Sequence, residues 1–365
     1  MKLGEICSFQ SGGTPSKNDE EFFNGSIPWI TTVALNGKHI NATNAIDWIS
    51  EKAIQKSAAK IVPSNSIMIG TRVGVGKVAI NDVEMSTNQD IISLIGIDES
   101  RWNKDFLCKF IQSKNHFLIG QARGATIKGI KMDLLSSLEI PTFSIEKQSL
   151  ISNVLNHIMK IIDSRRRELQ ALDDLIKAQF VEMFGDPITN SMGWKVKRFD
   201  AICENLDSRR KPITASDREA GAYPYYGASG IVDYVADYIF DEDILLISED
   251  GANLLMRSTP IAFSVSGKVW VNNHAHVVRF ENMGLQKYVE VYISMIDISD
   301  QITGSAQPKL NQAKLNALMI PIPDKDKIDR FLDILQQINK SKFVVQKALD
   351  KAQLLFDSLM QKYFR

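Results

Sequence analysis

The segment that comes closest to a catalytic loop is GTRVGVGKV at residues 70–78, which has the glycines and the lysine of a phosphate-binding loop. A Walker A loop requires G-x-x-x-x-G-K followed by Ser or Thr. Here the outer glycines are one residue too far apart, and Val78 takes the Ser/Thr position. We therefore expect no nucleotide hydrolysis. The segment predicts a tight hairpin that either presents Arg72 and Lys77 to DNA or is purely structural.

Two local groups of basic residues have the charge needed to contact phosphate groups. They are Arg123, Lys128 and Lys131 in the first half of the chain, and Arg209, Arg210 and Lys211 within SRRKP in the second half. Such groups are equally common as solvated surface. The sequence leaves both interpretations open.

Other polar residues have the geometry to read bases. Arg suits guanine, and Asn or Gln suits adenine. The amide candidates are Asn88 and Gln89 in STNQD, Asn253, and Asn272 and Asn273 in NNHAH, with His274 beside them. In YPYYGASG, Tyr225 and Tyr226 could contact sugar or phosphate, or could pack at the edge of a core.

No signature of catalysis accompanies these residues. The Asp/Asn-Pro-Pro-aromatic tetrapeptide of amino-methyltransferases does not occur, and the one Asp-Pro pair, at 186–187, continues with Ile. A glycine-rich cofactor fingerprint and a helicase-type phosphate loop are also missing from the sequence. His274 and His276 would share one strand face, but no third ligand is near in sequence, so we expect a structural role and no metal. We predict a chain that does no chemistry and holds no cofactor.

The length and composition of the chain narrow the classes of protein to which it can belong. The 365 residues suggest two or three domains. With 43 basic and 43 acidic residues the net charge is zero, which counts against a protein that coats nucleic acid by overall attraction. A DNA binder would need local basic groups or a partner subunit. Three scattered cysteines, no signal-type apolar core and no apolar run of spanning length predict a cytoplasmic protein.

The elements that must position these residues are duplicated. GATIKGIKMDLLSSLEIPTF at 124–143 aligns without a gap with GSAQPKLNQAKLNALMIPIP at 304–323, at an offset of 180. KLGEIC and SIMIGTRVG in the first half have counterparts RFDAIC and DILLISEDG in the second. The helical segments 144–184 and 324–364 keep the offset of 180 and are a fourth anchor. Four anchors in the same order indicate an internal repeat whose ends agree and whose middles diverge.

A long helix is predicted after each copy, at 144–184 and 324–365. Apolar residues recur there at alternating steps of three and four, as in Leu155, Ile158 and Ile162 or Leu335 and Ile338. About 40 residues make a rod of roughly 60 Å, longer than a domain of ordinary size. We expect the two helices to pack on each other, although each could instead lie on its own domain.

The remaining blocks, 1–143 and 185–323, contain short alternating strands with tight turns and one helical stretch each. The predicted fold class is α+β. Two mixed α/β domains are each followed by a long helix, and the helices form an antiparallel coiled coil with pseudo-twofold symmetry.

This layout resembles the specificity subunit of type I restriction–modification systems. Short sequence motifs typical of that family also occur along the chain. They are SGGTPSK, IPWI, YPYYGASGIVDYV and NNHAHVVRF, with EIPTFSIEKQSLI and MIPIPDKDKIDRF where the long helices begin. The resemblance implies two target-recognition domains that each read one half-site of double-stranded DNA. It also implies two methyltransferase subunits docked on the helices and carrying S-adenosylmethionine, and motor-nuclease (restriction) subunits.

Two other functions compete with this one. An enzyme that reads and modifies DNA in one polypeptide would need a cofactor motif that the sequence lacks. A coiled-coil scaffold with two protein-binding heads would need none of the base-reading residues.

Overall fold

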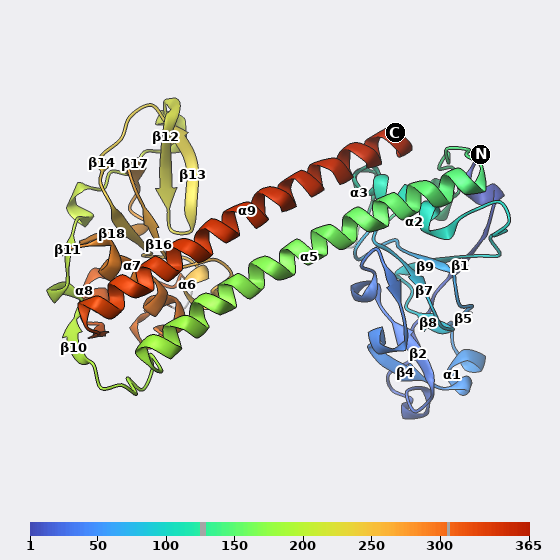
Figure 1. Cartoon of the computed structure of the whole chain (residues 1–365). Coiled ribbons are helices and arrows are strands. Elements are labelled where there is room, and N and C mark those ends of the chain that lie inside the picture. The colour runs from blue at the N-terminus through green and yellow to red at the C-terminus, as the bar shows by residue number, and fades with distance from the viewer. Residues whose placement is uncertain (125–128, 305–306) are drawn as a thin grey trace. The chain divides into compact units, whose positions relative to one another are not determined.

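The computed structural model describes residues 1–124, 129–304 and 307–365. The chain forms two compact units (Figure 1). Unit 1 is Met1–Arg165 with Ala348–Arg365, and unit 2 is Arg166–Lys347.

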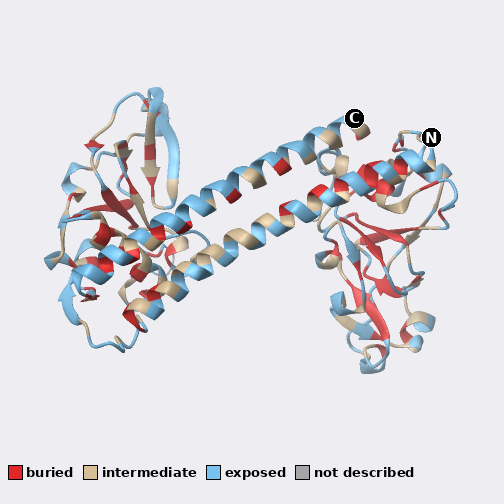
Figure 2. Ribbon diagram, in the orientation of Figure 1, coloured by how far each residue is buried: buried red, intermediate tan, exposed pale blue. Residues whose placement is uncertain are grey.

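Unit 1 contains two mixed sheets, formed by short apolar strands. The five-stranded sheet has the order β1 (Ser8–Ser11), β9 (Ile91–Ile95), β6 (Ile67–Gly70), β7 (Val78–Asn81) and β3 (His39–Ile40). The four-stranded sheet has the order β4 (Asp47–Ile49), β2 (Ile27–Ile30), β8 (Met85–Thr87) and β5 (Ile61–Val62). Every residue of β6 and β7 is buried, which explains their continuous apolar runs (Figure 2).

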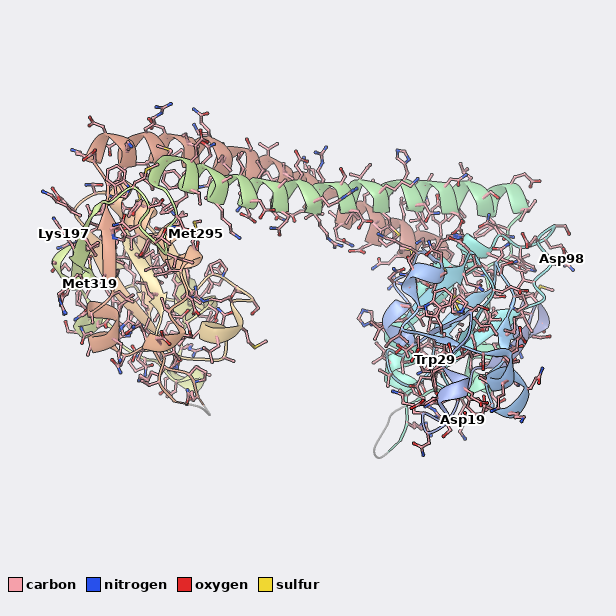
Figure 3. The ribbon with its side chains drawn as sticks, turned by 90° about the horizontal axis from the view of Figure 1, so that it is seen from below. Asp19, Trp29, Asp98, Lys197, Met295 and Met319 are labelled. Atoms are coloured by element: carbon pink, nitrogen blue, oxygen red, sulfur yellow. The ribbon has the colours of Figure 1, made fainter. Side chains whose placement is uncertain are left out.

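Unit 2 repeats this design. One sheet has the order β11 (Cys203–Asn205), β18 (Ala275–Phe280), β15 (Ile244–Ser248) and β16 (Ala262–Val265). The other has the order β13 (Gly230–Val235), β12 (Ala220–Gly227), β17 (Lys268–Val271) and β14 (Phe240–Asp241). A two-stranded sheet of β10 (Lys195–Arg198) and β19 (Met319–Ile322) closes the domain, and Lys197 and Met319 mark its two strands in Figure 3.

The strand directions confirm the internal repeat. The central strand β2 pairs antiparallel with β4 and parallel with β8, and β12 pairs in the same way with β13 and β17. The antiparallel order β1-β9-β6-β7 likewise matches β11-β18-β15-β16. The two halves therefore share a topology even where their sequences have diverged.

Short helices pack on the sheets of each unit. On the first sheet lie α2 (Lys104–Ser113), α3 (Asn115–Gln121) and α4 (Met132–Ser136) in unit 1, and α6 (Asn253–Met256), α7 (Met283–Met295) and α8 (Gln312–Asn316) in unit 2. Helix α1 (Glu51–Lys56) instead packs on the four-stranded sheet of unit 1. Asn103 and Asn282 cap α2 and α7, and each side-chain oxygen accepts a backbone N–H at 2.9 Å.

Two unbroken helices of 40 residues follow the repeats, α5 (Ile145–Phe184) and α9 (Lys325–Phe364). In unit 1 the early residues Ile158 and Ile162 of α5 pack on Ala352, near the end of α9. In unit 2 the order is reversed, because Phe180 near the end of α5 contacts Phe331 near the start of α9 at 5.6 Å between ring centroids. The predicted antiparallel pairing is confirmed, and Lys342 of α9 forms an ion pair with Asp173 of α5.

The last residue of each long helix enters a domain core. The ring centroids of Phe184 and Tyr288 lie 4.9 Å apart in unit 2, and those of Phe364 and Phe106 lie 5.1 Å apart in unit 1. Phe364 is 1% exposed although it is the penultimate residue of the chain. The end of α9 therefore completes the core of unit 1.

Phe364→Ala should destabilise unit 1 by about 3–5 kcal/mol, because it removes a buried aromatic ring and leaves a cavity. Leu354→Ala is the matched control on the same helix, since Leu354 is 71% exposed, and should change stability by less than about 0.5 kcal/mol. Urea unfolding monitored by amide hydrogen exchange in residues 67–111 measures both. Equal effects of the two variants would contradict the role of Phe364.

Candidate nucleic-acid interface

A junction of loops forms where the two sheets of each domain meet. In unit 1, the N–H of Asn88 donates to Ile30 O (3.1 Å) and the N–H of Thr71 donates to Asp90 O (2.7 Å). In unit 2, Asn272 donates to Tyr226 O (3.0 Å) and Glu249 donates to His274 O (2.9 Å). The β8–β9 and β17–β18 connections are thus equivalent, and they carry the predicted residues Asn88–Gln89 and Asn272–Asn273.

The two asparagines that begin these connections are largely buried. Asn88 is 8% exposed and donates to Asp90 Oδ2 at 3.1 Å, whereas Asn272 is 6% exposed and accepts the N–H of His274 at 2.8 Å. Their neighbours Gln89 and Asn273 are exposed, although Gln89 Oε1 accepts a hydrogen bond from the Thr14 hydroxyl. The side chains of Asn88 and Asn272 hold the loops in place, and the side chains that follow them are presented outward.

A pocket of about 730 Å³ in unit 1 brings together basic residues that are distant in sequence. Arg72, Arg123 and Lys131 line it, with Gln121 and Asp133. The hairpin prediction for residues 70–78 is confirmed, since β6 and β7 pair antiparallel on either side of it. Arg72 and Lys77 are exposed on this hairpin. Lys128 lies outside the described residues.

A second pocket, of about 580 Å³, gathers the predicted residues of unit 2. Its lining includes Tyr225, Asn253, Asn272, Asn273 and His274. These residues come from strand β12, the first residue of α6 and the connection between β17 and β18.

Several members of this lining already have internal partners. Asn253 bonds the backbone of Thr259 with both its amide nitrogen and its oxygen, at 3.0 Å each. His274 Nδ1 lies 2.9 Å from Asp250 Oδ2, yet His274 remains about half exposed. Asn273 is the exposed amide of the pocket.

The two tyrosines of YPYYGASG differ in environment. Tyr225 is 1% exposed, its hydroxyl accepts the N–H of Ile213 at 2.9 Å, and the Arg218 guanidinium lies 4.6 Å from its ring centroid. Tyr226 packs on Phe263 at 6.0 Å. No motif in the sequence singled out Arg218, which lines the same pocket.

The residues of SRRKP divide in the same way. Arg209 donates to Glu242 Oε1 at 2.6 Å and covers the ring of Phe240, while Arg210 donates to Glu249 Oε2 at 2.6 Å. The Arg210 side chain is only 13% exposed. Lys211 is exposed. Arg210 therefore connects the loops, whereas Arg209 and Lys211 are exposed on either side of it.

Arg210 belongs to a network beneath the loops that includes Asp207, Glu249 and His276. His276 is fully buried, and its ring nitrogens face Asp207 Oδ2 (2.7 Å) and Leu310 O (2.8 Å). The three acidic and imidazole groups are close enough to surround a metal ion. Arg210 bonds both carboxylates, so the guanidinium supplies the positive charge there.

This network controls the acid–base behaviour of Asp207. Burial raises the pKa of that carboxyl, but the hydrogen bonds from His276 and from the Val277 N–H, together with Arg210, outweigh burial and leave the pKa below its usual range. The pKa of Glu249 is lowered in the same way, with burial opposed by Arg210, His276 and Lys309.

Residues 1–173 and 192–351 match the family model of the type I restriction modification DNA specificity domain. The chain belongs to this family. It is similar to the type I restriction enzyme MjaIX specificity subunit of Methanocaldococcus jannaschii, with 23% identity over 99% of this chain and 91% of that protein. It is also similar to the EcoprrI specificity subunit of Escherichia coli, with 24% identity over 94% of this chain and 90% of that protein.

The fold is that of a solved relative. The crystal structure of the type I restriction-modification S subunit from M. genitalium superposes with a TM-score of 0.63 at 16% identity, covering 100% of this chain and 95% of that one. The chain is thus a non-catalytic specificity subunit that recognises the DNA target within a restriction–modification complex, and S-adenosylmethionine belongs to the methyltransferase subunit. Among the described helices, none combines the length and the apolar character needed to cross a membrane.

Asp207→Asn should lower the free energy of unfolding of unit 2 at pH 7 by about 3 kcal/mol, because it removes the anionic partner of the buried His276 ring and of the Arg210 guanidinium. A carboxyl with a lowered folded-state pKa stabilises the fold above its unfolded pKa of about 4, and this stability is lost as the pH falls through the folded pKa. The variant should therefore lose less stability than the parent between about pH 4 and pH 2.

Urea unfolding at a series of pH values tests this expectation. Asp300→Asn is the control, since Asp300 is an exposed carboxyl of the same unit. If both variants showed the parent's acid dependence, the network would not carry the stability assigned to it.

Proposed function

We propose that residues 1–143 and 185–323 are two target-recognition domains that together read a bipartite double-stranded DNA target. The helices at 144–184 and 324–365 then fix the spacing between the half-sites. Two methyltransferase subunits dock on the helices, and restriction subunits join the complex. A subunit that reads the cell's DNA in this way would work in the cytoplasm. Family membership favours this function over the scaffold with two protein-binding heads.

The observation that carries the proposal is the duplicated loop junction. Each domain holds a buried asparagine, Asn88 or Asn272, at the same point of the same topology, and displays a different amide, Gln89 or Asn273, directly after it. Two domains that recognise different half-sites need the same loop framework with different exposed side chains, and this is the arrangement found at the two junctions. An amide side chain can bond the N6 and N7 positions of adenine together.

The remaining exposed candidates fall into roles according to their charge and partners. Arg72 and Arg123 line one pocket with Lys131 and can contact guanine or phosphate. Lys77 and Lys211 are exposed and suit phosphate contact. Arg210, Tyr225 and Asn253 position the loops, because their polar groups are bonded within the domain.

Gln89→Ala should relax one base position of a single half-site, at a cost of about 1–3 kcal/mol in discrimination. Asn273→Ala should do the same in the other half-site. Asn88→Ala and Asn272→Ala are the matched comparisons, and each should weaken its whole half-site because the loop loses its support. Methylome sequencing of a host carrying each variant reports the recognised motif. A uniform loss at both half-sites after Gln89→Ala would reassign Gln89 to backbone contact.

The chain alone should bind DNA weakly and gain affinity when its methyltransferase subunit is present, because its net charge is zero and part of the phosphate contact must come from the partner. Fluorescence anisotropy with a labelled duplex carrying the target, at about 150 mM salt, measures both states. Tight, sequence-specific binding by the chain alone would contradict this expectation.

A further inference from the structure

A polar pocket of about 510 Å³ lies in unit 1 between α2, the start of α5 and the loop before β3. None of the residues discussed above as DNA candidates lines it. Its cationic residues are Lys38, Lys109 and Lys160, and its acidic residues are Asp105 and Asp163. Lys38 is paired with Asp163, and Asp105 lies 3.4 Å from His39. Three lysines and two carboxylates line the pocket, so its lining has an excess of one positive charge.

Lys109 has an unusual environment for a lysine. It is 2% exposed, and its ammonium donates a hydrogen bond to Met159 Sδ at 2.8 Å. Lysine is almost never fully buried without an anionic partner. Burial lowers the pKa of Lys109, and the attraction of Asp105, one helical turn earlier, only partly offsets it because the two side chains do not form an ion pair in the described part of the chain.

The internal repeat shows that the fold does not require a lysine at this position. In α2, Phe106 packs on Phe364, and in α7, Tyr288 packs on Phe184, so the two rings occupy equivalent positions. Three residues later, α2 has Lys109 and α7 has Val291, which packs against the apolar core of unit 2. An apolar residue therefore suffices for packing, and the charge of Lys109 needs another explanation.

The surface beside the pocket has the character of a protein interface. Leu150, Val154 and Ile161 of α5 are 56%, 39% and 42% exposed, and they follow the steps of four and seven that place residues on one helix face. His157 occupies the missing position of this stripe and also lines the pocket. A partner that covers the stripe would place its own side chains at the pocket.

We propose that this pocket receives a carboxylate side chain of the methyltransferase subunit, with Lys109 as the residue that binds it. The inference rests on the proposed assembly with that subunit. Because unit 2 has Val291 in place of Lys109, this contact occurs at one of the two recognition domains only. The two methyltransferase copies are then held by different contacts.

Lys109→Val, which copies the residue of the equivalent helix, tests the proposal in the full-length chain. Isothermal titration with the methyltransferase subunit, without DNA, should show binding at the first site weakened at least tenfold. Lys60→Val removes the same charge from an exposed position of unit 1 and should leave binding unchanged. The thermal unfolding midpoint of Lys109→Val should equal or exceed that of the parent chain. If the valine variant fails to fold, Lys109→Met, which keeps an apolar stem of similar length, is used in the same titration.

Three results would count against the proposal, and they are distinguishable. Unchanged affinity of the folded Lys109 variants would overturn the pocket contact and leave the assembly intact. Equal weakening by Lys109→Val and Lys60→Val would reduce the effect to long-range charge and also overturn it. No binding by the parent chain would overturn the proposed assembly itself.

Discussion

The burial of two phenylalanines at the ends of the long helices is the constraint on which the architecture depends. Phe184 ends α5 inside the core of unit 2, and Phe364 ends α9 inside the core of unit 1. Each helix begins on one domain and finishes in the core of the other, so the helices can only run antiparallel. The ends of both long helices are therefore part of the two hydrophobic cores and are not merely attached to them.

The parts of the fold that follow from local periodicity could be predicted from the sequence. The seam that includes Leu155, Ile158 and Leu335 indicated the long helices, and the alternating segments around residues 66–80 and 243–280 indicated the strands. The repeat also predicted an equal topology for both domains. These features depend on residue order within one segment, which a sequence displays directly.

The candidate site was harder to predict from the sequence, because the exposure of a side chain depends on segments that are far apart in the chain. Asn88 and Gln89 are adjacent and chemically alike, yet one is buried and the other is displayed. Arg210 and Lys211 differ in the same way, since only Arg210 meets the carboxylates of Asp207 and Glu249. No local sequence pattern tells which of two such neighbours is buried. The contacts that the folded loops make determine which side chain is buried and which is exposed.

The composition of unit 1 has a consequence for biosynthesis. Its residues are separated by the whole of unit 2, which is contiguous from Arg166 to Lys347. A ribosome releases the chain from its N-terminus, and domains ordinarily fold in that order. Here every residue of unit 2 is synthesised before the segment Ala348–Arg365 of unit 1, so the core of unit 1 acquires Phe364 only after unit 2 has been made. A product that stopped before Ala348 would carry a complete unit 2 and an unfinished unit 1.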